Sequence, residues 1–172
     1  MIVFHEQVQD AKLDEDASIL TRQNFFRHGS RHEIVDGLKR DKFVTDEFVI
    51  HTVYGCEMVV TNTASSPQVI ELLFQVPKGA IPIAESKYTE TMTLEVPAYS
   101  TASHAYFFYF PTSGTYEHFP VHVAVGEKTV SFAKPFTFNV VDEPTQLDSE
   151  SWDYVSQNGT NEEVMEFLKS HN

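Results

Sequence analysis

The stretch TYEHFPVHVAV, residues 115–125, holds two imidazoles, His118 and His122, with Pro120 between them. Histidine is a common metal ligand and proton carrier, so this pair is the first candidate for chemistry. The stretch alternates as a β-strand, and its apolar residues at 119, 121, 123 and 125 assign both histidines to the outer face. Residues four apart on one strand face are about 13 Å apart, whereas zinc–nitrogen bonds are about 2 Å long. We therefore expect no metal here and interpret both histidines as surface or partner-contacting residues.

Cys56 is the only cysteine, which excludes an internal disulfide and every multi-cysteine zinc or iron–sulfur pattern. It falls between Tyr54 and Met58 on the apolar side of a predicted strand, where a thiol is normally an inert core residue. A catalytic thiolate needs a base within reach and an electropositive setting, and the adjacent residues supply neither. The G-x-S-x-G, P-loop, G-x-G-x-x-G and H-E-x-x-H patterns do not occur in the chain. We expect neither enzyme activity nor a cofactor.

The charge of the chain limits its partners. A formal net charge of -13 repels phosphate backbones and anionic lipid, so we expect no nucleic-acid binding and no membrane insertion. One stretch, RQNFFRHGSRH at residues 22–32, combines basic and aromatic residues as a single-stranded nucleic-acid platform does. Because the rest of the chain is acidic, an intramolecular contact with the acidic DEDA or linker segment is the favoured interpretation of this stretch.

The elements that must position these residues are strands. A chain of 172 residues fits one ordinary domain with a sizeable core. Apolar and polar residues alternate with period two, and turn signals separate the runs at residues 54–60, 70–76, 87–96, 102–110, 116–125 and 129–141. The 102–110 run has rings on both faces, with Tyr106 on one face and Phe107 and Tyr109 on the other. In the last run Phe132 shares a register with the inner residues, and Pro135 indicates an edge or a bulge.

Two segments carry a resemblance to a known class of domain. VYGCEMVVTNTASSPQVIELLFQVPKGAIPI resembles the strand, turn, strand and proline-closed loop of immunoglobulin-like sandwich modules in large surface and secreted proteins. VPAYSTASHAYFFYFPTSGTYEHFPVHVAV is similar to their next part, in which Gly-x-Tyr opens the penultimate strand. The resemblance covers residues 48–141, and macroglobulin-type domains are the nearest relatives that it suggests. It implies an antiparallel immunoglobulin-like β-sandwich and export to the cell envelope or beyond, with a cytoplasmic location left open.

The two ends of the chain differ from this central part. Residues 1–47 are expected to add a strand or two and a loop to the sandwich, with a tight hairpin turn at Asp36-Gly37. Residues 142–159 have the polar composition of a linker, in which Trp152 serves as an anchor. Residues 160–171 predict a helix with a capping box, Thr160 and Glu163. This helix belongs either to the sandwich or to the start of a following domain.

These patterns together favour a mainly β fold with a short C-terminal α-helix. We expect a non-catalytic protein-interaction or spacer module of a larger multidomain protein, whose partner is another protein or a neighbouring domain. The alternative is an accessory sandwich that contacts carbohydrate or substrate for an enzyme whose catalytic part lies outside this chain. Exposed rings on a sheet are where binding affinity concentrates. The expected contact residues are Tyr106, Phe107, Tyr109, His118 and His122.

Overall fold

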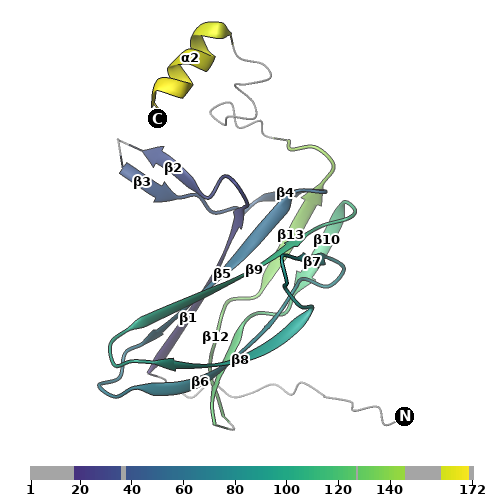
Figure 1. The fold of residues 1–172 in the computed structure, drawn as a ribbon. Coiled ribbons are helices and arrows are strands. Elements are labelled where there is room, and N and C mark those ends of the chain that lie inside the picture. Colours follow the sequence, from purple (N-terminus) through teal and green to yellow (C-terminus); the bar gives the residue numbers. More distant parts are fainter. Residues whose placement is uncertain (1–17, 36–37, 127, 146–159, 171–172) are drawn as a thin grey trace. The chain divides into compact units, whose positions relative to one another are not determined.

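A computed structural model describes residues 18–35, 38–126, 128–145 and 160–170 (Figure 1). The first sheet has four antiparallel strands in the order β1-β5-β9-β7. The second sheet has the order β12-β11-β6-β8, and the third has the order β10-β13-β4. Their bounds are β1 Ile19–Arg27, β4 Glu47–Val49, β5 Val53–Asn62, β6 Gln68–Gln75, β7 Ile81–Ile83, β8 Thr89–Val96, β9 Thr101–Tyr109, β10 Gly114–His118, β11 His122–Val125, β12 Lys128–Phe132 and β13 Phe136–Val141.

The second and third sheets are two halves of one layer. β10 continues into β11 after residues 119–121, and β12 continues into β13 after residues 133–135. Each interruption contains a proline, Pro120 or Pro135, which has no N–H to donate to a ladder. The interruptions at residues 119–121 and 133–135 lie side by side, and a hydrogen bond from the Ala133 N–H to the Val121 carbonyl at 2.9 Å joins them. β4 closes the third sheet by parallel pairing with β13.

The order of the strands is that of an immunoglobulin-like sandwich. In chain order, β1, β5 and β9 take the places of strands A, B and E in one layer. β6, the β10–β11 strand and the β12–β13 strand take the places of C, F and G in the other layer. The expected mainly β fold with an immunoglobulin-like sandwich is therefore confirmed, and the parallel pair of β4 with β13 is a departure from the purely antiparallel arrangement that was expected.

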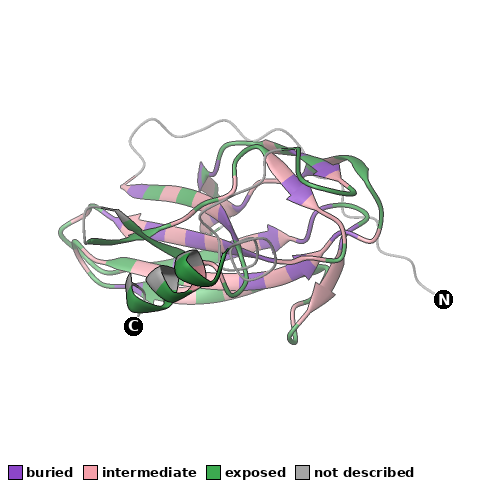
Figure 2. Ribbon diagram, turned by 90° about the horizontal axis from the view of Figure 1, so that it is seen from above, coloured by how far each residue is buried: buried purple, intermediate pink, exposed green. Residues whose placement is uncertain are grey.

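The core lies between the two layers, and the period-two pattern of the sequence builds it. More buried and less buried positions alternate along the strands in Figure 2. The predicted inner residues of β5, from Tyr54 to Val60, are at most 2% exposed. Phe25 of β1 packs against the rings of Phe108 and Phe138 at centroid distances of 6.4 and 4.7 Å, mostly edge to face. Burial of these rings removes apolar surface from water, which is the main contribution that stabilises the fold.

The predicted register of residues 116–125 is wrong in its first half. Within β10 the inner residues are Tyr116 and His118, whereas within β11 the inner residue is Val123. Pro120 interrupts the ladder between them, and a slip of one residue moves every side chain to the opposite face. His118 is consequently buried, at 6% exposure, and does not lie on the outer face that the alternation assigned to it.

The same cause explains a second error in the last strand. The prediction placed Phe132 in register with Phe136 and Phe138, but Phe132 is 41% exposed while Ser131 and Ala133 are buried. The edge or bulge expected at Pro135 is confirmed as the break between β12 and β13. The two prolines therefore change the register of both bent strands at the same level.

The Gly-x-Tyr of the resemblance opens β10 at Gly114, and its tyrosine, Tyr116, makes a structural contact that the sequence did not predict. Its hydroxyl donates to the carbonyl of Thr112, four residues earlier, at 2.7 Å. This bond ties the start of the penultimate strand to the preceding corner, which is the tyrosine corner of immunoglobulin-like sandwiches. Its ring also packs on the core, 4.7 Å from Phe110.

The segments outside the central strands are simpler. β2 (His32–Val35) and β3 (Leu38–Asp41) pair as a hairpin around residues 36–37, which lie outside the described residues. The helix α2 (Asn161–Ser170) belongs to a separate compact unit that begins at Glu143. The predicted linker anchor Trp152 lies outside the described residues. No helix in the described part of the chain is long and apolar enough to cross a membrane.

Candidate interaction surface

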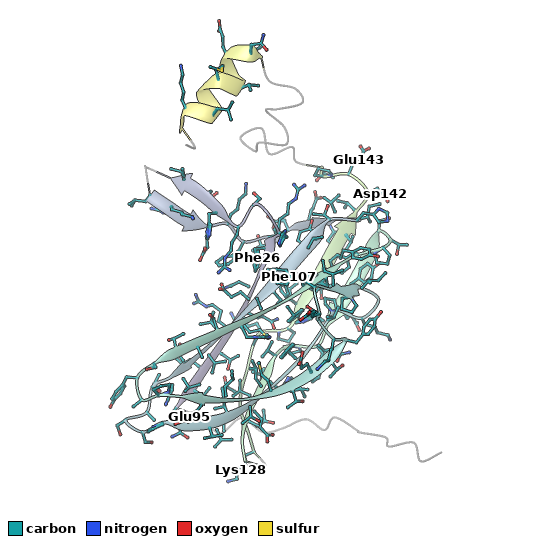
Figure 3. The ribbon with its side chains drawn as sticks, viewed as in Figure 1. Phe26, Glu95, Phe107, Lys128, Asp142 and Glu143 are labelled. Atoms are coloured by element: carbon teal, nitrogen blue, oxygen red, sulfur yellow. The ribbon has the colours of Figure 1, made fainter. Side chains whose placement is uncertain are left out.

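The outer face of the first sheet carries a row of residues that crosses all four strands. The register pairs Phe26 with Gly55, Gly55 with Phe107, and Phe107 with Ile83. The Phe26 ring lies flat over Gly55, where any Cβ would overlap it. The rings of Phe26 and Phe107 are 6.1 Å apart and perpendicular, and Figure 3 shows them close together. This geometry needs a glycine at position 55.

The row and its neighbours form a half-exposed apolar surface. Phe107 and Tyr109 are both half-buried, as expected for the outer face of β9. The His28 ring stands edge-on to Phe107 at 5.6 Å, and Ile81 pairs with Tyr109 in the adjacent row. We call this surface the outer aromatic patch and define it by His28, Ile81, Ile83, Phe107 and Tyr109 over the buried Phe26.

Charged residues fix one border of the patch. The Arg31 guanidinium lies 4.9 Å above the Phe26 ring and donates to the Glu57 carboxylate. Arg31 also faces Asp41 at 3.8 Å, which links the base of the β2–β3 hairpin to the first sheet. The basic stretch was expected to contact the acidic DEDA or linker segment. The DEDA segment and residues 146–159 of the linker lie outside the described residues, so that contact stays a prediction. The described partners of Arg31 are Glu57 on strand β5 and Asp41 on the hairpin.

Two of the predicted contact residues lie in the interior, so they cannot form an outer surface. Tyr106 is 1% exposed because it is on the inner face of β9. Its hydroxyl donates to the Gln75 carbonyl at 3.1 Å and lies 2.9 Å from Nε2 of His118. Nδ1 of His118 lies 3.2 Å from Nε2 of Gln23, which is a donor. We therefore assign the proton of His118 to Nε2, with Nδ1 as the acceptor.

The electrostatics of this interior network argue for a structural role. Burial lowers the pKa of His118 to about 4, so the imidazole is neutral at pH 7. Burial also raises the pKa of the Cys56 thiol to about 12, and raises the pKa of the adjacent Tyr106 hydroxyl. A thiol that stays protonated is a poor nucleophile. Cys56, Tyr106 and His118 thus form a neutral, hydrogen-bonded core group.

His122 lies in a third place, on the outer face of the second sheet. Its ring stacks between Phe119, at 4.6 Å, and Phe132, at 5.6 Å. Its Nδ1 lies 2.7 Å from the Pro120 carbonyl, which accepts a hydrogen bond from that nitrogen. The five residues predicted as one contact surface are therefore split among the outer aromatic patch, the core and the second sheet. Only Phe107 and Tyr109 share a surface.

The sequence prediction missed two residues that shape these sites. Phe26 completes the outer aromatic patch, and a signal for it existed, because a glycine inside a strand often marks the close approach of another group. Gln23 fills the space at the two strand breaks, donating to the Lys134 carbonyl at 3.0 Å and accepting from the Val121 N–H at 3.2 Å. No local pattern indicates the role of Gln23, since its partners are about a hundred residues away in sequence.

Comparisons with known proteins give one strong sequence match. The chain is 32% identical over 173 residues to actin-binding protein F of Dictyostelium discoideum. That alignment covers 100% of this chain and 7% of the Dictyostelium protein. The chain is thus similar, over its whole length, to a small segment of a much longer protein. No protein-family model matches it.

Solved structures give weaker likenesses. The CARDB domain of a Pyrococcus furiosus protein aligns with a TM-score of 0.42 and 9% identity, over 81% of this chain and 100% of that one. An immunoglobulin-like protein of Pseudomonas aeruginosa aligns with a TM-score of 0.35 and 15% identity, over 74% of this chain and 100% of that one. The assignment of the fold rests on the strand order, and these likenesses add nothing to it.

Proposed function

We propose that this chain is a non-catalytic interaction module of a longer protein, which binds another protein or a neighbouring domain through the outer aromatic patch. The observation that carries the proposal is the set of half-exposed rings, Phe107 and Tyr109, on a rigid four-stranded sheet. Aromatic side chains with few rotatable bonds are where binding energy concentrates in protein interfaces. The absence of enzyme activity and the resemblance to macroglobulin-type domains remain predictions.

The path of the chain through the sandwich supports a place in a series of domains. The Ser18 carbonyl, just before β1, accepts from the N–H of Thr63, just after the end of β5. The Val141 carbonyl, at the end of β13, accepts from the N–H of Ile50, shortly before β5 begins. The sandwich therefore starts and finishes at opposite ends of β5, whose ten residues span roughly 33 Å. In such a module the chain enters at one end of the sandwich and leaves at the other, so that neighbouring domains can follow in a row.

A second candidate function comes from the Dictyostelium relative. Because that protein is named as actin-binding, the segment similar to this chain has a role in an actin-binding protein. Direct contact of this chain with actin filaments is the sharper form of that candidate. We favour a supporting role over direct contact, and cosedimentation with filaments distinguishes the two, since only direct contact brings the chain into the pellet.

The main test measures binding of the 172-residue chain to the adjacent segments of its full-length protein by titration calorimetry. Phe107→Lys and Tyr109→Lys should weaken binding at least tenfold, because each places a charge in the apolar contact. Phe132→Lys is the matched control, since it changes an exposed ring on the opposite layer. Circular dichroism checks that each variant folds. Equal affinities for all three variants would show that the outer aromatic patch is not the binding surface.

A further inference from the structure

A separate feature of the fold is the open edge of β1. Among the described residues, β1 is an outer strand of the first sheet and forms a ladder only with β5, while β12 of the other layer lies near it. In an antiparallel pair, alternate residues direct their N–H and C=O groups to the partner strand and the others direct them away. The Phe25 carbonyl faces away from β5, because it accepts a hydrogen bond from the Val44 N–H at 2.7 Å. The two-residue period gives Thr21 and Gln23 the same direction, and no backbone group of the described residues pairs with them.

A groove runs along this edge. It has a volume of ≈ 450 Å³, within the range of ligand sites in proteins, and lies between residues 21–25, 43–45 and 134–136. Phe43 and Phe136 supply apolar surface, and Phe43 remains 37% exposed. Thr21 also lines the groove, and its buried hydroxyl lacks a hydrogen-bond partner among the described residues. The groove therefore offers apolar contacts beside backbone groups that have no partner.

The charge of the groove differs from that of the whole chain. Its charged lining residues are Arg22 and Lys134, both exposed, and no carboxylate lines it. The chain as a whole has a formal net charge of -13. A positive groove on a strongly negative protein attracts a negatively charged segment and discriminates against a basic one.

The other outer strands are less suited to pairing, and two of them, β4 and β10, have only three and five residues. β7 has only three residues, one of them Pro82, which lacks an N–H. β8 carries two carboxylates, Glu90 and Glu95, which repel an acidic segment. β12 has five residues and ends close to the break at Pro135. Among the described strands, β1 thus combines length, a free edge and positive charge.

We infer that the free edge of β1 is a docking site for an extended acidic peptide segment of a partner protein, which adds to the first sheet as a fifth strand. The segment pairs its backbone with Thr21 and Gln23. Its alternate apolar side chains enter the groove beside Phe43 and Phe136, and its carboxylates meet Arg22 and Lys134. Strand addition of this kind takes affinity from the backbone and specificity from alternate side chains. The site is distinct from the outer aromatic patch, so neither proposal depends on the other.

The test uses a fluorescein-labelled, capped peptide of four Glu-Val repeats and the 172-residue chain, with binding followed by fluorescence anisotropy. We expect saturable binding that a Lys-Val peptide does not show. A Glu-Val peptide with alternate amides N-methylated should bind at least tenfold more weakly, because it cannot donate to a strand edge. Peptide binding should also slow amide hydrogen exchange at Thr21 and Gln23, which a purely electrostatic contact would not do.

Variants of the chain provide the controls. Arg22→Glu combined with Lys134→Glu should reduce affinity at least tenfold, while Lys78→Glu combined with Lys128→Glu, the same charge change at exposed residues away from the groove, should leave it unchanged. All the changed residues are exposed, so the fold should be retained. Equal binding of the N-methylated and unmodified peptides, or no binding of either, would overturn the proposal. So would sedimentation data showing that the edge pairs with a second copy of this chain.

Discussion

At the scale of single residues, the buried His118 ties the pH dependence of stability to one side chain. Its pKa is lowered to about 4 by burial, against 6.5 in the unfolded chain. A depressed histidine pKa favours the neutral form in the fold. Its stabilising contribution is therefore complete above pH 6.5 and is lost as the pH falls from 6.5 towards 4.

This gives the first prediction. Between pH 7 and pH 4 the free energy of unfolding should fall by about 3 kcal/mol more for the wild-type chain than for His118→Asn, because asparagine cannot be protonated. Urea unfolding at a series of pH values measures both slopes. If the two slopes agree, the buried neutral imidazole is not the source of the pH dependence.

Gly55 determines the position of the Phe26 ring, because the ring occupies the space that a Cβ at position 55 would need. Gly55→Val would force the Phe26 ring off the sheet, since no Cβ fits beneath it, and should destabilise the chain by about 1–3 kcal/mol. In a Phe26→Ala background the same substitution should cost much less, because the space is then free. Chemical denaturation of the four proteins measures this cycle. Additive effects would show that the ring does not depend on the glycine.

At the scale of elements, the sequence predicts unbroken strands well and broken ones poorly. For β5 and β6 the period-two pattern gives both the strand and its inner face, and for β9 it gives the strand and separates its two faces, because a regular ladder preserves the alternation. For residues 116–125 and 129–141 it gives the wrong inner face before the proline and the correct one after it, since a local irregularity reverses the faces. Phe107 and Tyr109 were therefore placed correctly, and His118 was not. The amount of slip depends on contacts with distant residues, which a local pattern does not contain.

The two breaks also give a prediction about Gln23, which joins them. Gln23→Leu leaves the Val121 N–H, the Lys134 carbonyl and Nδ1 of His118 without this partner, and should destabilise the chain by about 2–3 kcal/mol. Asn24→Ala, at the next position on the outer face, is the matched control and should change stability by less than about 0.5 kcal/mol. Thermal unfolding compares them. Similar effects of the two substitutions would show that water replaces the amide without loss.

At the scale of the whole molecule, the fold and the sequence match describe a module inside a longer protein. The chain aligns over its full length with 7% of the Dictyostelium actin-binding protein F. The first strand of the sandwich begins at one end of β5 and the last strand ends at the other, as in domains that follow one another along a chain. The surface that we propose for binding a neighbouring domain or another protein is the outer aromatic patch. Location in a secreted or cell-envelope protein remains a prediction.

Amide hydrogen exchange of the 172 residues, alone and within the full-length protein, tests most directly whether the module binds through the outer aromatic patch. We expect slower exchange in the full-length protein at Ile81–Ile83 and at residues 106–109, which carry the outer aromatic patch. The opposite face, at β11 and β12, should exchange equally in both. Unchanged exchange at β7 and β9, or protection confined to β11 and β12, would contradict the proposal that the module binds through this patch.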